Sequence, residues 1–409
     1  MNLARELNQQ ISALADQAQD GGALAALRQA SRARLAANLL PEKFSEAWKY
    51  TKLRALEAGH LQTLTAAAAA PADLPSFGEL PPLVIVNGRL PATLPDWPGV
   101  TLAPLADADS ELTSTTFALL NGATLDAGLH LSVAAGAQVE GLLHIIFYST
   151  GNTPSHHNTR LTVALGANSR LQLVEQYLGQ GPALTNAVTH LHAGDNSELT
   201  HCRLQSEAAD SLHIGQLAMQ LARNSRVHSH QYMSASALKR NDVRVRLEGE
   251  GAELTMSGAF VATGKGHVDN QVCVEHAVPH CTSTQSYKGI AGDSARAIFN
   301  GRIHILPGAS KTNADLSNKN LLLSLGAEID SKPELEIYND DVKCSHGTTI
   351  GQIDPMMRFY LQSRGIDADT AQRMLSIGFI QEELNKLPFA EVAGWISHWL
   401  GQAVTEAAQ

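Results

Sequence analysis

The sequence predicts a mainly β fold: a parallel β-solenoid with α-helical segments before and after it in the chain. Short β-branched runs bounded by Gly, Asn or Asp fill residues 81–354, and no helical stretch separates them. A turn of small residues also recurs at a period of roughly 27–30 residues, which is typical of solenoids. Its occurrences are centred on Gly136, Gly166, Gly194, Asn224 and Gly251. An antiparallel sandwich is the alternative, but one repeated turn favours stacked coils.

The length and charge of the chain limit its size class and its partners. Its 409 residues exceed a single ordinary core, so two or three structural units are expected. The formal charge is 30 − 40 = −10, which disfavours nucleic acids and anionic membranes as partners. The start, "MNLARELNQQISALADQ", lacks signal-peptide character, and no apolar run approaches the ~20 residues of a membrane span. We therefore expect a cytoplasmic protein with four reduced cysteines.

The first zone, residues 1–80, is expected to be a helical domain followed by a linker. Leu3, Leu7 and Ile11 recur at helical spacing. Pro41 interrupts this pattern, and "EAWKYTKLRAL" after it is expected to form a short helix or helical turn. The stretch that follows is rich in Ala and Pro, which predicts an irregular connection to the first strand.

The last zone, residues 355–409, shows helical texture again. Gly365 is expected to end a first helix, Asp367 or Asp369 to cap the next, and Pro388 to separate the third. Three short helices at this place in the chain predict a cap on the end of the solenoid. Their apolar side chains could also offer a surface to a partner.

One candidate site lies at 341–351, "DVKCSHGTTIG". Side chains alternate along a strand, so Val342, Cys344 and His346 share one face and Lys343 points to the other. A low-pKa thiolate and an imidazole, ~7 Å apart along the strand, could both bind a soft metal. Two ligands do not complete a four-coordinate site. A buried structural cysteine beside a hydrogen-bonded histidine is the alternative, and residue chemistry alone favours it.

A second and weaker candidate is "CVEHAVPHC" at 273–281, the densest group of potential metal ligands in the chain. His280 and Cys281 are the residues considered for a metal site there. Pro279 argues against a helix that would bring His276 and His280 together. The favoured interpretation is therefore loop and strand residues at a corner of the solenoid.

Signatures of enzymes are missing from the sequence. It contains no G-x-x-x-x-G-K-[ST] phosphate loop, no G-x-S-x-G elbow and no convincing dinucleotide fingerprint. We therefore do not expect this chain to hydrolyse ATP or to be an enzyme. A cytoplasmic, carbohydrate-active β-helix enzyme is the alternative function, and such enzymes need clustered acids on an exposed groove.

Several motifs resemble the SufB/SufD family of the SUF iron–sulfur cluster assembly machinery. They are "WKYT" within 46–56, "PHCTSTQSYKGIAGDSARAIFNGRIHI" at 279–305, the stretch 311–354 and the helical segment 359–379. The form "EIYNDDVKCSHG" is similar to the SufD branch of that family rather than to SufB. The strong similarity covers chiefly residues 279–380.

The resemblance implies a right-handed parallel β-helix that serves as an assembly scaffold. It implies a complex with SufB and two copies of the ATPase SufC. The unpaired sheet edge near the C-terminal end of the β-helix predicts the contact with SufB, and the apolar C-terminal helices predict the contact with SufC. An isolated chain is expected to be able to form a homodimer through the same edge. The residues expected to contact SufC are Phe359, Arg364, Gly365, Ile366, Met374 and Phe379.

The resemblance also assigns the functional histidine of the family to His346, with Cys344 beside it. These two residues are expected to hold iron or a nascent iron–sulfur cluster transiently, while SufB completes the ligand shell. No cofactor is expected to bind the isolated chain stably, although the complex could hold a flavin. Iron acquisition and cluster formation are expected to be driven by the SufC ATPase.

Overall fold

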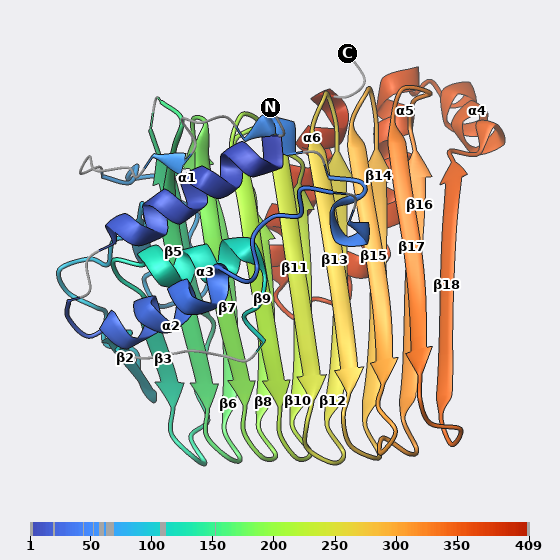
Figure 1. Ribbon diagram of the computed structural model, residues 1–409. Coiled ribbons are helices and arrows are strands. Elements are labelled where there is room, and N and C mark those ends of the chain that lie inside the picture. The colour runs from blue at the N-terminus through green and yellow to red at the C-terminus, as the bar shows by residue number, and fades with distance from the viewer. Residues whose placement is uncertain are drawn as a thin grey trace.

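The computed structural model shows a two-sheet β-solenoid with helices on both of its faces (Figure 1). It describes residues 3–18, 21–43, 45–51, 53–56, 61–62, 69–106, 112–151 and 153–406. From the third strand onward, successive strands alternate between two nine-stranded sheets, so strands two apart in the chain are hydrogen-bonded neighbours along most of each sheet. The prediction of stacked coils is confirmed. No helix among these residues is both long and apolar enough to cross a membrane.

The two sheets have simple strand orders. Sheet B consists, in order, of β1 (Leu83–Val86), β4 (Leu143–Thr150), β6 (Arg170–Gln180), β8 (Glu198–Gln205), β10 (Arg226–Ser234), β12 (Glu253–Ala262), β14 (Thr282–Ala291), β16 (Asn313–Leu322) and β18 (Lys343–Gln352). Sheet A consists, in order, of β2 (Val100–Pro104), β3 (Leu129–Val133), β5 (Ser155–Leu165), β7 (Ala183–Ala193), β9 (Leu212–Leu221), β11 (Leu238–Leu247), β13 (His267–His276), β15 (Arg296–Ile305) and β17 (Glu328–Ile337). The pairing is parallel throughout, except that β2 and β3 are antiparallel.

The core lies between the sheets and is built from ladders of aliphatic side chains. One ladder of sheet A, with one residue from each coil, runs through Val163, Leu191, Met219, Val245 and Val274. Each of these residues is at most 2% exposed. Burying a side chain of this size stabilises the fold by about 1.5–3 kcal/mol. Because side chains alternate along each strand with period two, every coil contributes inner-facing residues of this kind, which stack on those of the next coil.

Residues with a left-handed backbone form the corners where sheet A turns into sheet B. Gly136 and Gly251 have φ angles of 76° and 75°, and Asn168, Asn196 and Asn224 have φ angles of 58°, 56° and 53°. Gly and Asn adopt this conformation at little cost, which explains the recurring turn of small residues. The asparagines also stack, since Nδ2 of Asn196 donates to Oδ1 of Asn168 at 3.2 Å and Nδ2 of Asn224 to Oδ1 of Asn196 at 3.1 Å.

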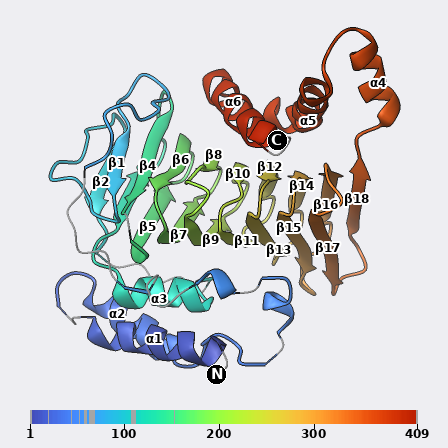
Figure 2. The same ribbon diagram turned by 90° about the horizontal axis from the view of Figure 1, so that it is seen from above.

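Helices from the first part of the chain cover the outer face of sheet A (Figure 2). They are α1 (Leu3–Gln17), α2 (Ala25–Leu35) and α3 (Thr116–Thr124). Leu7 and Ile11 of α1 belong to one apolar cluster with Leu184, Leu212 and Ile214 of the sheet. The expected helical turn after Pro41 is present as two short 3₁₀ turns, η1 (Glu46–Trp48) and η2 (Leu53–Ala55).

Helix α3 contradicts the expectation that no helix interrupts the strand region. Thr115 caps its start, because its hydroxyl accepts a hydrogen bond from the Ala118 backbone at 3.3 Å. All residues from Thr116 to Ala123 are buried, because the helix contacts α1, α2 and sheet A. A short helix that is buried on every side has no amphipathic period, so the usual sequence signal of a helix is missing here.

The C-terminal helices are α4 (Pro355–Ser363), α5 (Ala368–Leu384) and α6 (Ala390–Glu406). The predicted boundaries are confirmed: Gly365 after α4 has φ of 85°, and Asp367 caps α5 by accepting from the Thr370 backbone at 2.9 Å. The expected cap on the solenoid end is wrong, because α5 and α6 fold back over the outer face of sheet B (Figure 2). That face carries apolar side chains at Val174, Cys202, Leu204, Tyr232, Ala259, Val261 and Ile290.

Candidate functional site

The solenoid is open at its C-terminal end. Strands β17 and β18 are the last of sheets A and B, and within the described residues no further strand pairs with either. Nearly all of β18 is exposed, and most of β17 is half-buried. Helix α4 follows β18 after two residues and stands beside this end (Figure 2). The backbone edge and the inner face of the last coil are therefore accessible to another chain.

Cys344 and His346 lie on the inner face of β18. Cys344 is in register with Ala314 and His346 with Leu316, and both of these β16 residues belong to the core between the sheets. Val342 and Cys344 also contact that core. The prediction that Val342, Cys344 and His346 share one face is confirmed, because strand alternation is maintained through the last coil.

The two side chains differ in their surroundings. Cys344 is half-buried and His346 is exposed. Burial, with a further effect of the Asp315 carboxylate, raises the pKa of the Cys344 thiol. The expectation of a low-pKa thiolate is therefore wrong for the chain on its own. A metal ion at the sulfur would itself favour the thiolate.

The potential ligands at this end form an incomplete set. The part of the chain that the structure describes contains no group of three or more His, Cys, Asp or Glu side chains placed to hold a metal ion. Cys344 and His346 offer two ligands, whereas a tetrahedral site needs four. Within the described residues no further ligand joins them, so a complete iron site needs ligands from elsewhere, such as another molecule or sulfide.

Polar side chains beside His346 were not singled out from the sequence. The Ser331 hydroxyl of β17 lies 2.6 Å from the Thr348 hydroxyl of β18, and it donates to Oδ1 of Asn318 at 2.7 Å. Thr348 follows His346 by two residues and shares its face. The alternation of side chains in "HGTTI" does place Thr348 on the face of His346, but polar strand residues are ordinarily interpreted as facing solvent. The last coil thus combines two potential ligands with a pair of hydroxyl groups.

His280 and Cys281 lie in different environments. His280 is exposed and occupies a corner with φ of 60°, the kind of position that Asn168 and Asn224 occupy in earlier coils. Cys281 belongs to the core, where its thiol lies 3.3 Å from the Gly249 carbonyl oxygen and burial raises its pKa. The structure therefore favours the interpretation of both as corner residues.

Helix α4 presents an apolar face to solvent. None of its residues is buried. The exposed fractions of its large apolar side chains are 70% for Met356, 58% for Met357, 62% for Phe359 and 56% for Tyr360. Met374 on the neighbouring helix α5 is 48% exposed. Contiguous exposed apolar side chains of this kind mark an interaction surface.

The other residues expected to bind SufC are placed less uniformly. Arg364 and Gly365 are exposed at the junction of α4 and α5, and Ile366 is half-buried there. Phe379 packs against sheet B, and the ammonium group of Lys288 lies 4.9 Å from the centre of its ring. Phe379 therefore helps to attach α5 to the solenoid.

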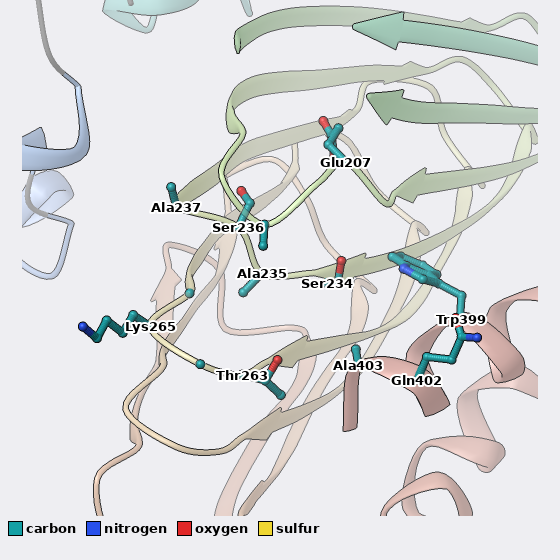
Figure 3. Close-up of a pocket in the computed structure, with 13 residues that line it drawn as sticks. Glu207, Ser234, Ala235, Ser236, Ala237, Thr263, Lys265, Trp399, Gln402 and Ala403 are labelled. Carbon is teal, nitrogen blue, oxygen red and sulfur yellow. The ribbon is translucent and has the colours of Figure 1, made fainter. Parts of the chain in front are cut away.

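A cavity of about 610 Å³ lies between corners of the solenoid and helix α6 (Figure 3). Small residues and Trp399 form its walls, and the Lys265 side chain points away from it. Glu207 is the one acid among its described lining residues, and its carboxylate is held by Lys239 at 2.8 Å and His213 at 2.6 Å. A glycosidase uses two carboxyl groups that flank the substrate. This cavity gives no support to a carbohydrate-active enzyme.

A groove of about 450 Å³ on the outer face of sheet A does contain several acids, but each is paired with a base. The pairs are Asp242 with Arg240 at 3.2 Å, Glu275 with Arg246 at 3.2 Å, Glu336 with Arg302 at 3.2 Å, and Glu46 and Glu334 with Lys332 at 2.8 Å and 2.6 Å. Ion pairing favours the charged carboxylate, whereas a general acid needs a raised pKa.

Comparison with protein families identifies the chain. The family model described as "SUF system FeS cluster assembly, SufBD core domain" matches residues 147–379, more than half of the 409 residues. This chain belongs to the SufBD family. The matched region runs from β4 to α5 and includes the whole last coil with His346. The resemblance noted in the sequence is thereby confirmed.

Several relatives support the SufBD assignment over most of the chain. SufD of Escherichia coli (strain K12) is 31% identical, over 84% of this chain and 84% of its own length. An iron–sulfur cluster assembly SufBD family protein of Synechocystis is 28% identical, over 95% of this chain and 94% of its own. SufD of Bacillus subtilis (strain 168) is 27% identical, over 69% of this chain and 64% of its own.

Proposed function

We propose that this SufBD-family chain is a scaffold subunit for iron–sulfur cluster assembly and that it acts through the open end of its solenoid. The observation that carries the proposal is the last coil, where Cys344 and His346 share an inner face beside unpaired sheet edges. Thiolate and imidazole groups suit iron. The family supports the chemistry, and the geometry supports the location.

The proposal requires a second chain at this end. A SufB-type partner that pairs its own sheet edges with β17 and β18 would cover His346 and bring further ligands to it. It would also bury Ile337 and Ile350, which are 41% and 47% exposed. Two copies of this chain could satisfy the same edges as a two-fold dimer. Iron and sulfide are the cargo of the site.

Helix α4 is the proposed contact for the ATPase SufC. Met356, Met357, Phe359 and Tyr360 give it an exposed apolar face that the fold of this chain does not use. The sequence has no phosphate loop of its own, so ATP would act through the partner. We place the complex in the cytoplasm, where thiols remain reduced.

The test is anaerobic co-purification of the tagged chain after co-expression with SufB- and SufC-type proteins of the same organism. Iron and acid-labile sulfide are then measured per complex. The proposal expects all three chains in one complex, with iron and sulfide retained. A chain that purifies alone, or a complex that never acquires iron, would contradict it.

A further inference from the structure

The outer face of sheet A carries charges that alternate in sign from strand to strand towards the open end. The outward-facing charged residues are Arg240, Asp242, Arg244 and Arg246 on β11; Asp269 and Glu275 on β13; Arg296 and Arg302 on β15; and Glu328, Asp330, Lys332, Glu334 and Glu336 on β17. The net charges of these rows are 3 − 1 = +2, −2, +2 and 1 − 4 = −3.

Arg–carboxylate ion pairs join two of the three neighbouring pairs of rows, and between β13 and β15 the contact is Glu275 with His304 at 3.1 Å. Between β11 and β13, Arg246 and Glu275 approach to 3.2 Å. Between β15 and β17, Arg302 pairs with Glu336 at 3.2 Å and Arg296 with Asp330 at 2.8 Å. Opposite charges on facing positions stabilise neighbouring strands, and like charges destabilise them. The alternation therefore makes the outer face of each of these strands complementary in charge to that of its neighbour.

Strand β17 ends the series with the acidic row. Glu328 and Glu336 remain 57% and 41% exposed, although each already has an arginine on the β15 side. A carboxylate can accept hydrogen bonds on both sides. The next strand of the sheet, if it continues the alternation, would present cations to these carboxylates.

We propose that the strand which extends sheet A beyond β17 is basic on its outer face, and that the acidic row of β17 selects a different chain over a second copy of this one. The inference rests on the proposed function, in which a partner solenoid pairs with this edge. The occupant is thus the edge strand of another β-solenoid, with Lys or Arg opposite Glu334 and Glu336.

The side-chain charges make a second copy a poorer match than a basic strand for the same edge, even though its backbone could pair there. A two-fold axis perpendicular to the sheets would pair β17 with its own copy in antiparallel orientation. When that pair is centred on Lys332, Lys332 faces Lys332, Glu334 faces Asp330, and Glu336 faces Glu328. In this register all of these contacts join like charges on one face, which opposes pairing. With the pair centred on Ser331 or Pro333, Lys332 would face an acid, but two of the remaining acids would still face each other. A basic partner strand converts the acidic contacts into opposite-charge pairs.

The test compares a double variant, Glu334→Gln with Glu336→Gln, with a matched control, Glu198→Gln with Glu253→Gln. The control makes the same change in net charge on sheet B. Its two glutamates also pair with cations, Arg170 at 3.5 Å and Arg226 at 3.3 Å. Sedimentation measures self-association of the purified chain. Titration against the SufB-type partner at several NaCl concentrations measures affinity and its salt dependence.

The double variant is expected to bind the partner roughly tenfold more weakly, with a flatter salt dependence, and to self-associate more strongly than wild type. The control should match wild type in all three measurements. Unchanged partner affinity and salt dependence in the double variant would overturn the inference. A double variant that binds the partner more weakly, self-associates more weakly and melts at a lower temperature would also overturn it. If the wild-type chain binds no partner, the proposed function fails. The self-association measurement still tests the charge inference in that case. A double variant that self-associates no more strongly than wild type would overturn the charge inference.

Discussion

Cys281 and Cys344 show that the surroundings of a cysteine depend on its position along the solenoid. Cys281 lies in the core beneath a corner, and Cys344 lies half-buried on the inner face of the last coil. Inner-facing side chains of earlier coils are buried in the core, whereas those of β18 are exposed or half-buried. The position of a thiol along the solenoid therefore decides whether it is packed on all sides or open to another molecule.

Replacing each cysteine by Ala should separate these roles. Cys281→Ala is expected to destabilise the chain by about 1–2 kcal/mol, because it leaves a gap in a packed core. Cys344→Ala should leave the thermal midpoint nearly unchanged but lower the iron and sulfide content of the complex. Thermal unfolding and metal analysis of both variants check this. Equal destabilisation by the two substitutions would contradict the assignment.

The sequence predicts the common face of Cys344 and His346 because strand alternation is a local rule. It does not predict their exposure, because nothing in "DVKCSHG" marks this coil as the last. The raised thiol pKa was missed for a related reason. Burial and the neighbouring Asp315 come from β16, about thirty residues earlier in the chain.

Helix α4 is the element that the account assigns to binding, whereas α5 and α6 are part of the fold. Removing residues 355–409 would uncover the apolar outer face of sheet B, so such a truncation would test folding as well as binding. Substitutions on the exposed face of α4 are the cleaner experiment. Phe359 is 62% exposed, whereas Ile380 of α5 is fully buried.

The pair Met356→Ser and Phe359→Ser on α4 is expected to keep the thermal midpoint and to abolish co-purification of SufC. Exposed side chains of this kind contribute little to stability. Ile380→Ala on α5 serves as the contrasting variant and should destabilise the chain by about 2–5 kcal/mol. Retention of SufC by a folded double variant would show that the ATPase binds elsewhere.

Element types and boundaries were predictable where local chemistry sets them. Gly365 and Asp367 mark the α4–α5 junction in the sequence and in the structure. The place of α5 and α6 was not predictable, because it depends on an apolar outer face assembled from several coils of sheet B. Helix α3 was missed because burial on every side removes the amphipathic pattern.

At the scale of the whole molecule, buried histidines are expected to make the solenoid sensitive to acid. Burial lowers the pKa of His144, His230 and His276 to about 4 in each case. An unfolded histidine has a pKa of about 6.5. Between these pH values the unfolded chain binds more protons than the folded one. The stability contributed by the neutral histidines is therefore complete above pH 6.5 and is lost as the pH falls towards 4.

The thermal midpoint is expected to fall steeply between pH 6.5 and pH 4, with a loss of up to about 3 kcal/mol for each of the three histidines at the lower limit. Calorimetry at pH 7.5, 6, 5 and 4.5 measures this. His276→Asn should reduce the slope, although its stability at neutral pH is lower. A midpoint that stays constant across the range would contradict the role of burial.

The overall architecture was predictable from the sequence because each coil ends in a similar turn, so the spacing of these turns gives the length of a coil. Asn168, Asn196 and Asn224 return at one corner, and their spacing reports the length of a coil. The open end was not predictable, because no local sequence pattern marks which coil is the last. The functional account depends on that end, where a SufBD chain exposes two potential ligands beside unpaired edges.

The most direct test is His346→Ala in the complex with the SufB- and SufC-type partners. We expect the complex to keep its composition and thermal midpoint but to lose most of its iron and sulfide, because the imidazole is exposed and is not part of the packed core. His280→Ala, at an exposed corner, should keep normal loading. Normal loading in His346→Ala would contradict the account, and loss of loading together with loss of folding would make His346 a structural residue.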